Sequence, residues 1–142
     1  MSEPLEILSA KQAILEGLYL YCCAVDRIDS SLLPKVWHQD AIVDYEGTFE
    51  GSASDCMELV FAMHRACDAT SHQITNAIIH IDDERATSES YVTACVRSGG
   101  NDFVVRGRYS DIWSKRNDEW RIDRRHYVQD VMHMIPVAEE TS

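Results

Sequence analysis

No run of the chain approaches the roughly 18 consecutive apolar residues that a membrane-spanning helix requires. The N-terminus lacks a basic segment followed by an apolar one, so no secretory signal is expected. Basic residues are also few: 13 Lys and Arg stand against 24 Asp and Glu, and the net charge is −11. Such a balance argues against a surface that follows nucleic-acid phosphates. We therefore expect a cytoplasmic protein with no membrane and no nucleic-acid partner.

Sequence motifs for the common cofactors are missing as well. The chain has no glycine-rich nucleotide-binding motif and no HExxH zinc motif. His64, His72 and His80 are evenly spaced, but they are expected on a helix, a junction and a strand, so the spacing has no common geometry. The five cysteines form no CxxC pair, and most are expected in helices as small apolar residues. We expect no cofactor, no metal and a reducing compartment.

A change of hydrophobic period divides the chain. With 142 residues, 45% of them hydrophobic, it is long enough for one domain with a core and an internal pocket. The first half has a period near 3.6 and predicts helices at 9–28, 31–37 and 52–69, with a strand at 41–45 and a turn or hairpin at 46–51. From His72 onward the period is 2, which predicts strands at 73–81, 87–97, 103–115 and 120–131.

Helices followed by an antiparallel meander indicate the α+β class. The N-terminal helices would pack in a strongly curved, mostly antiparallel sheet and form a conical barrel, whose mouth is a natural small-molecule site. We expect a single domain over residues 1–142, with a core at about 9–133 and a frayed tail at 137–142.

Two polar residues could form a catalytic pair. Asp26 closes the apolar stripe of the first helix, and His72 leads into the first long strand. A carboxylate that orients an imidazole makes a general base that works near neutral pH. The residues alone also allow a solvated Asp26 and a His72 that only closes a loop. Asn76, four residues after His72, shares its predicted strand face and would line a pocket.

A phenol near Asp26 could bind a substrate oxygen as a hydrogen-bond donor or acid. Tyr19 lies seven residues before Asp26, on nearly the same helical face, whereas Tyr21 is about 140° away. Helical geometry therefore favours Tyr19. Three further aromatic residues could form pocket walls, although core packing is their usual role: Tyr91, Tyr45 and Trp37.

Arg125 is out of phase with the apolar face of its predicted strand. Strict alternation places it opposite to Ile122, so it faces inward only if a β-bulge lies between the two residues. Without a bulge, Arg124 or His126 takes the inward position.

Four segments together resemble a known family. They are Tyr21–Asp29, Trp37–Ala41, His72–Asn76 and Trp120–Ile122, and their order and spacing are similar to the SnoaL-like branch of the nuclear-transport-factor-2-like superfamily. The resemblance spans roughly residues 10–130. It implies a conical α+β barrel with a deep apolar pocket, and chemistries that include dehydration, dehydrohalogenation, isomerisation, aldol cyclisation or none.

Within that superfamily the chain resembles hexachlorocyclohexane dehydrochlorinase, bile-acid dehydratase and scytalone dehydratase. The resemblance assigns Asp26 and His72 to the catalytic dyad of the first two. It assigns Tyr21 to a tyrosine of the bile-acid enzyme and Arg125 to an active-site arginine. The dehydrochlorinase has a lysine in place of Tyr21, which favours dehydration or a related elimination for this chain.

The resulting expectation is a cofactor-independent lyase that acts on a small hydrophobic cyclic or aromatic substrate. Its expected catalytic residues are Asp26, His72, Tyr21 and Arg125, and its expected substrate-binding residues are Tyr19, Asn76, Tyr91, Tyr45 and Trp37. Two alternatives remain: a non-catalytic binding or subunit-type module of the same fold, and an isomerase that uses the same dyad. By analogy we expect a homodimer or homotrimer.

Overall fold

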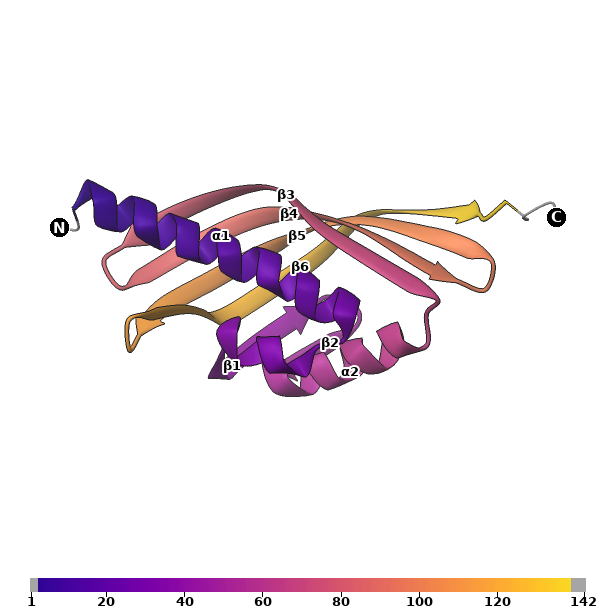
Figure 1. Cartoon of the computed structure of the whole chain (residues 1–142), viewed down its shortest axis with the longest axis horizontal. Helices are drawn as coiled ribbons and strands as arrows, with labels where there is room; N and C mark the ends of the chain where they lie inside the picture. Colours follow the sequence, from indigo (N-terminus) through magenta and orange to yellow (C-terminus); the bar gives the residue numbers. More distant parts are fainter. Residues whose placement is uncertain (1–2, 139–142) are drawn as a thin grey trace.

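The computed structural model describes residues 3–138 and has the predicted α+β architecture (Figure 1). Two α-helices, α1 (Pro4–Arg27) and α2 (Ala53–Arg65), and the 3₁₀-helix η1 (Ser30–Lys35) pack against one sheet. The six strands are β1 (Trp37–Tyr45), β2 (Phe49–Ser52), β3 (Ala69–Asp82), β4 (Arg85–Ser98), β5 (Asn101–Arg116) and β6 (Glu119–Pro136). Within residues 3–138, no helix is long and apolar enough to cross a membrane.

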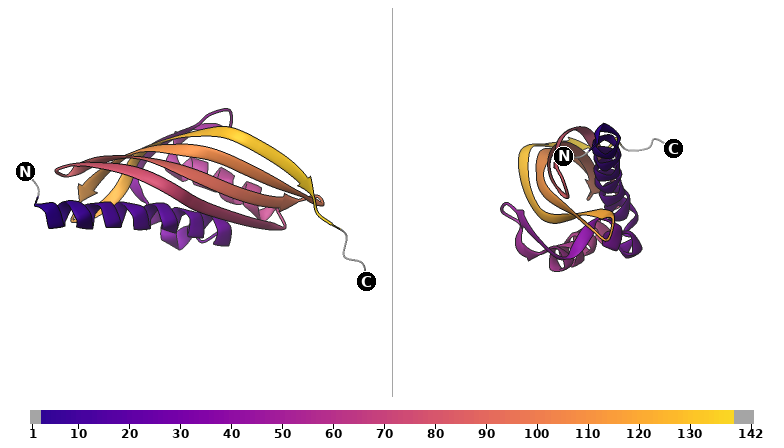
Figure 2. Two further views of the ribbon diagram at one scale, coloured as in Figure 1. Left: turned by 90° about the horizontal axis from the view of Figure 1, so that it is seen from above. Right: turned by 90° about the vertical axis from the view of Figure 1, so that its left-hand side faces the viewer.

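The sheet is open and strongly curled. Its strand order is β2-β1-β6-β5-β4-β3, and only the β1–β6 pair is parallel. The end-on view in Figure 2 shows the long strands curling toward α1, which runs along the length of the sheet. The expected cone is therefore a half-closed sheet whose open side is covered by helices.

Helix α1 supplies the centre of the core. Ile14, Leu18 and Val25 are at most 1% exposed. Gly17 lets the helix approach the sheet closely, because a Cβ there would lie 3.0 Å from the Trp113 ring. This contact sets the distance between the middle of α1 and the sheet.

Most element boundaries are wider than the sequence predicts. Helix α1 begins at Pro4, because Glu3 and Glu6 form a capping box and proline suits the first helical turn. Helix α2 is capped by Ser52, one of two serines (Ser52 and Ser54) that could begin it, but it ends at Arg65, and β3 begins at Ala69, where the helix was predicted to end. Each of β3 to β6 begins before and ends after its predicted range. Residues 139–142 of the predicted tail lie outside the described residues.

Irregular strand pairings decide which side chains face the helices. Strand β3 carries one extra residue, Thr75, against β4, and β6 carries Asp123 and Asp130 as extra residues against β5. An extra residue reverses the in–out alternation of the strand that carries it. Thr75 therefore decides the orientation of Asn76, and Asp123 decides that of Arg125.

Candidate functional site

Asp26 and His72 are in direct contact. The Nδ1 atom of His72 lies 2.6 Å from Oδ1 of Asp26, and the His72 backbone N–H donates to Oδ2 at 2.8 Å. The Thr70 hydroxyl donates to Oδ1 at 3.0 Å. Helix α1 thus presents its carboxylate to the first residues of β3, and three hydrogen bonds hold it there.

These contacts favour the ionised form of Asp26 and fix the tautomer of His72. Burial raises the pKa of Asp26, but the hydrogen bonds from the His72 side chain and backbone outweigh this effect and lower it below its ordinary value. An ionised carboxylate can only accept, so the Nδ1 atom of His72 carries the hydrogen. The neutral ring then has a bare lone pair on Nε2. The side chain of His72 is 10% exposed and that of Asp26 is 24% exposed, so the pair is shielded from bulk water but reachable.

Arg125 points inward because Asp123 is the extra residue that the inward orientation requires. The Arg125 side chain is fully buried and forms a two-pronged ion pair with Asp111, with N–O distances of 2.7 and 2.9 Å. Asp111 stands directly opposite Arg125 in the neighbouring strand, so the two side chains share a sheet face. Arg124 is exposed and His126 bonds Glu46 at the surface, so neither takes the inward position.

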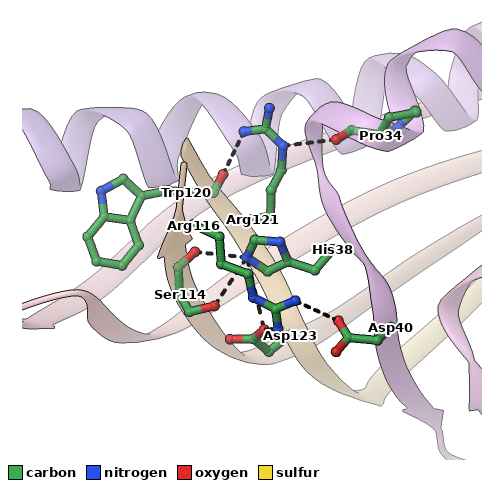
Figure 3. Close-up of polar contacts among 8 residues, drawn as sticks. All are labelled: Pro34, His38, Asp40, Ser114, Arg116, Trp120, Arg121 and Asp123. Atoms are coloured by element: carbon green, nitrogen blue, oxygen red, sulfur yellow. Dashed lines mark hydrogen bonds and ion pairs between the residues drawn. The ribbon is translucent and has the colours of Figure 1, made fainter. Parts of the chain in front are cut away.

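A polar cluster near the β5–β6 turn surrounds this bulge (Figure 3). Arg116 bridges Asp123 at 2.7 Å and Asp40 at 3.0 Å. His38 Nε2 lies 2.9 Å from the backbone oxygen of Ser114. The same cluster joins β1, β5 and β6 where their pairing is irregular. It therefore fixes the backbone geometry that turns the next inward side chain toward the core.

Aromatic rings enclose the Arg125 guanidinium. Its central carbon lies 3.8 Å from the Tyr109 ring centre, 4.5 Å from that of Tyr21 and 5.3 Å from that of Trp37. Burial alone would lower the pKa of Arg125, but the Asp111 charge raises it well above its ordinary value. Arg125 is thus a permanent cation in an aromatic cage. Its Nη1 atom is buried and has no hydrogen-bond partner among the described residues.

The tyrosine beside this cation is Tyr21. Its hydroxyl lies 2.8 Å from that of Tyr45, and both rings are buried. Burial raises the pKa of Tyr45 to about 12 although Arg125 lowers it, so both phenols keep their hydrogens at neutral pH. Tyr19 is 47% exposed, so the prediction from helical spacing that it lies at the site is wrong. That prediction assumed that the phenol of the site lies on the same helical face as Asp26. In the structure, the phenol of the site is that of Tyr21, which lies on the face that contacts Arg125.

Two predicted pocket residues lie on the outer face of the sheet. Asn76 is exposed, and Tyr91, its partner in β4, is 45% exposed. The extra residue Thr75 separates Asn76 from the face of His72 and reverses the alternation. The predicted pocket-lining role is therefore wrong for both residues. Trp37 and Tyr45, by contrast, are buried at the arginine cluster.

The dyad and the arginine cluster belong to the same interior. Burial raises the pKa of Cys22 to about 12, while Arg125 lowers it and Asp26 raises it, so the thiol lies within electrostatic reach of both groups. All five cysteines are free.

Tyr127 is a site residue that the sequence did not reveal. It stands opposite Tyr109 and Tyr45 in neighbouring strands and packs against both rings, with centroid distances of 5.2 and 5.4 Å. A Cβ at Gly107 would lie 2.5 Å from the backbone oxygen of Val128 and 2.7 Å from a ring carbon of Tyr127, so glycine is required both by the backbone and by this ring. Gly107 pairs with Val92 in β4. Across the sheet, this pair lies between the paired residues that include Tyr109 and those that include His72.

Other missed residues follow from the strand pairing. Asp111 shares the alternation of Tyr109 and Trp113 in β5, a signal that was present in the sequence. Thr70 lies before the start of the predicted strand, so its contact with the carboxylate was hidden. His64 was expected only as a residue of the third predicted helix, yet its ring lies beside that of His72.

Three surface hollows lie outside the dyad. One of about 1240 Å³ lies among η1, β1, α2 and the β5–β6 turn, and its lining includes Trp37 and Phe61. A second of about 1010 Å³ lies near the start of α1, and a third of about 510 Å³ lies on the outer sheet face. The residues that line these hollows do not include Asp26 or His72.

Comparison with known proteins identifies the family. The family model for the SnoaL-like domain matches residues 6–126. The chain belongs to the SnoaL-like family. Among proteins of curated function, no sequence matches the chain.

Solved structures show the same SnoaL-like fold at low sequence identity. A hexachlorocyclohexane dehydrochlorinase of type 2 has a TM-score of 0.83 and 17% identity, over 99% of this chain and 98% of that one. A candidate scytalone dehydratase from Novosphingobium aromaticivorans has a TM-score of 0.79 and 20% identity, over 95% and 97%. A nuclear-transport-factor-2-like superfamily protein from Salmonella enterica has a TM-score of 0.78 and 22% identity, over 88% and 94%. At these identities the likeness establishes the fold.

Proposed function

We propose that this SnoaL-like protein is a cofactor-independent lyase that eliminates water, or a related leaving group, from a small hydrophobic cyclic or aromatic substrate. The observation that carries the proposal is the contact between Asp26 and His72. A carboxylate-bound imidazole with a free Nε2 lone pair is a general base. The names of two structural neighbours, a dehydrochlorinase and a candidate dehydratase, describe elimination reactions.

In the proposed reaction, Nε2 of His72 removes a proton from a carbon next to an electron-withdrawing group. The electrons of that C–H bond form a carbon–carbon double bond, and the C–O or C–halogen bond breaks with its electron pair. The departing hydroxide takes the proton from the His72 imidazolium and leaves as water, which restores the neutral base. A halide leaves as an anion, and the imidazolium then releases its proton to solvent. Asp26 stabilises the imidazolium that forms on His72.

The second part of the site would stabilise negative charge that develops on the substrate. The Tyr21 hydroxyl is a neutral donor paired with Tyr45, and the Arg125 cation lies against the Tyr21 ring. A donor in a low-dielectric interior is worth more than the same donor in water. Tyr21 would bind the activating oxygen, and Arg125 would act through its fixed charge.

A product assay with a panel of cyclic and aromatic alcohols and halides tests this function. His72→Ala is expected to lower the rate of elimination on the order of 10²- to 10⁴-fold, because the general base is gone. His80→Ala is the matched control, since His80 is an exposed histidine on the outer face of the same strand.

Three outcomes of this assay would contradict the proposal. Full activity in His72→Ala would exclude the dyad as the base. Binding of panel members without turnover by the wild type would indicate a binding module. Deuterium uptake from solvent without loss of a leaving group would indicate an isomerase.

We also propose that the chain forms a homodimer or homotrimer. The far end of β6 carries apolar side chains that are 42 to 60% exposed: Val131, Met132, Met134 and Ile135. Because side chains alternate along a strand, Val131 and Ile135 lie on one face and Met132 and Met134 on the other, and a partner chain would cover these exposed apolar side chains. Light scattering after size exclusion should give two or three times the chain mass of 16.2 kDa. A monomer at all concentrations would contradict this proposal.

A further inference from the structure

A second imidazole lies against the dyad. His64 is in the last turn of α2, and its ring centroid is 5.3 Å from that of His72, with 39° between the ring planes. The short connection from Arg65 to Ala69 returns the chain directly to the start of β3. Two histidines that come from different elements therefore meet beside one carboxylate.

The hydrogen-bond chemistry of His64 fixes its tautomer. Its Nδ1 atom lies 2.6 Å from the carbonyl oxygen of Val60. A carbonyl oxygen can only accept, so Nδ1 carries the hydrogen. Burial lowers the pKa of His64 and so does the neighbouring His72, although the Val60 bond raises it. The ring is neutral at neutral pH, and its Nε2 atom has a bare lone pair.

That Nε2 atom has no partner. It is buried and unbonded among residues 3–138. A buried acceptor without a donor is costly, and native structures rarely leave one unpaired without a functional reason. The adjacent His72 cannot supply a donor while it is neutral, because its own Nε2 is also bare. Within the described part of the chain, no three His, Cys, Asp or Glu side chains are arranged to hold a metal ion.

We propose that His64 accepts a hydrogen bond from a hydroxyl or N–H group of the ligand, next to the C–H bond that His72 deprotonates. The inference rests on the proposed function and specifies its substrate class. The substrate is a small apolar molecule that carries a hydrogen-bond donor close to its acidic carbon. A halogenated hydrocarbon that keeps C–H bonds but carries no hydroxyl or N–H group has no such donor and would leave the lone pair of His64 unpaired.

Two probe ligands of similar size separate the contribution of the ligand's hydrogen-bond donor to binding from the contribution of its apolar ring. Phenol carries a hydroxyl, and toluene carries a methyl group in its place. Dissociation constants are measured by NMR titration for the wild type and for His64→Phe, which keeps an aromatic ring but has no acceptor. The preference of the wild type for phenol over toluene is expected to fall roughly tenfold in His64→Phe, the loss of about one hydrogen bond.

Two further variants make the test specific. His80→Phe, a matched change on the outer face, should leave the preference unchanged. His64→Gln supplies an amide oxygen as an acceptor and should restore part of it. An unchanged preference in a folded His64→Phe variant would overturn the proposal, and so would an equal fall in His80→Phe.

The binding ratio is measured without turnover, so its outcome is independent of the elimination assay. If no compound of the panel is turned over but the preference for phenol over toluene falls as expected in His64→Phe, the lyase proposal is refuted and the proposed role of His64 stands. Turnover that depends on His72, together with an unchanged ratio, would keep the lyase and refute the role of His64.

Discussion

Asp111→Ala is expected to lower the free energy of unfolding by about 3–5 kcal/mol. The change removes the partner of Arg125, whose side chain is fully buried and bound to Asp111 at 2.7 and 2.9 Å. The aromatic cage around Arg125 offers no other anion, so the cation is left buried and unpaired. Urea denaturation followed by circular dichroism measures the loss.

The charge, and not the shape of the side chains, should be responsible for this loss. Replacing both partners at once, in Asp111→Leu/Arg125→Met, should cost much less than Asp111→Ala, because no unpaired charge remains. Asp102→Ala breaks a similar two-pronged pair with Arg97 at the surface and should have a far smaller effect. A double variant as unstable as Asp111→Ala would contradict the electrostatic explanation.

Asp26→Asn is expected to lower the rate of elimination on the order of 10²- to 10⁴-fold. The carboxylate accepts hydrogen bonds from Thr70, from the His72 backbone and from His72 Nδ1. An amide has one acceptor oxygen and a donating NH₂ group, so at least one of these donors would face another donor. The ring of His72 would lose its tautomer or its orientation, and the imidazolium would lose its counter-charge.

The same variant has a signature in the pH dependence of stability. The pKa of Asp26 is lowered in the folded state from its ordinary value of 3.8. A lowered pKa stabilises the fold above the unfolded pKa, and that contribution is lost as the pH falls through the folded pKa. The stability advantage of the wild type over Asp26→Asn should therefore shrink below about pH 3.8. An advantage that grows in acid would contradict the ionised carboxylate.

Much of the fold could be predicted because the spacing of apolar residues along the sequence shows directly which side chains are buried. The long strands and the three helices follow from apolar spacing, and serine at position 52 marks the start of α2. The Asp26–His72 pair was accessible only through the family resemblance. Their 46-residue separation crosses a helix, a hairpin and a second helix, and no local pattern reports such a contact.

The errors arise where one residue is added to a strand. The bulge at Asp123 was recognised as a condition for an inward Arg125, because an arginine on the wrong parity required one. No residue near Thr75 was out of phase with its predicted strand, so the bulge there was not predicted and Asn76 was assigned to the wrong face of the sheet. His64 was missed because its contact depends on where α2 ends, and helix ends are poorly determined by propensity.

The most direct measurement of the central claim is a two-bond ¹H–¹⁵N NMR correlation of the His72 ring. The account predicts a hydrogen on Nδ1, bound to the Asp26 carboxylate and shifted downfield, and a bare Nε2 in the neutral form of the ring. The downfield signal should disappear in Asp26→Asn. A His72 ring with its hydrogen on Nε2, or a ring signal that is unchanged in Asp26→Asn, would show that the carboxylate does not orient the base.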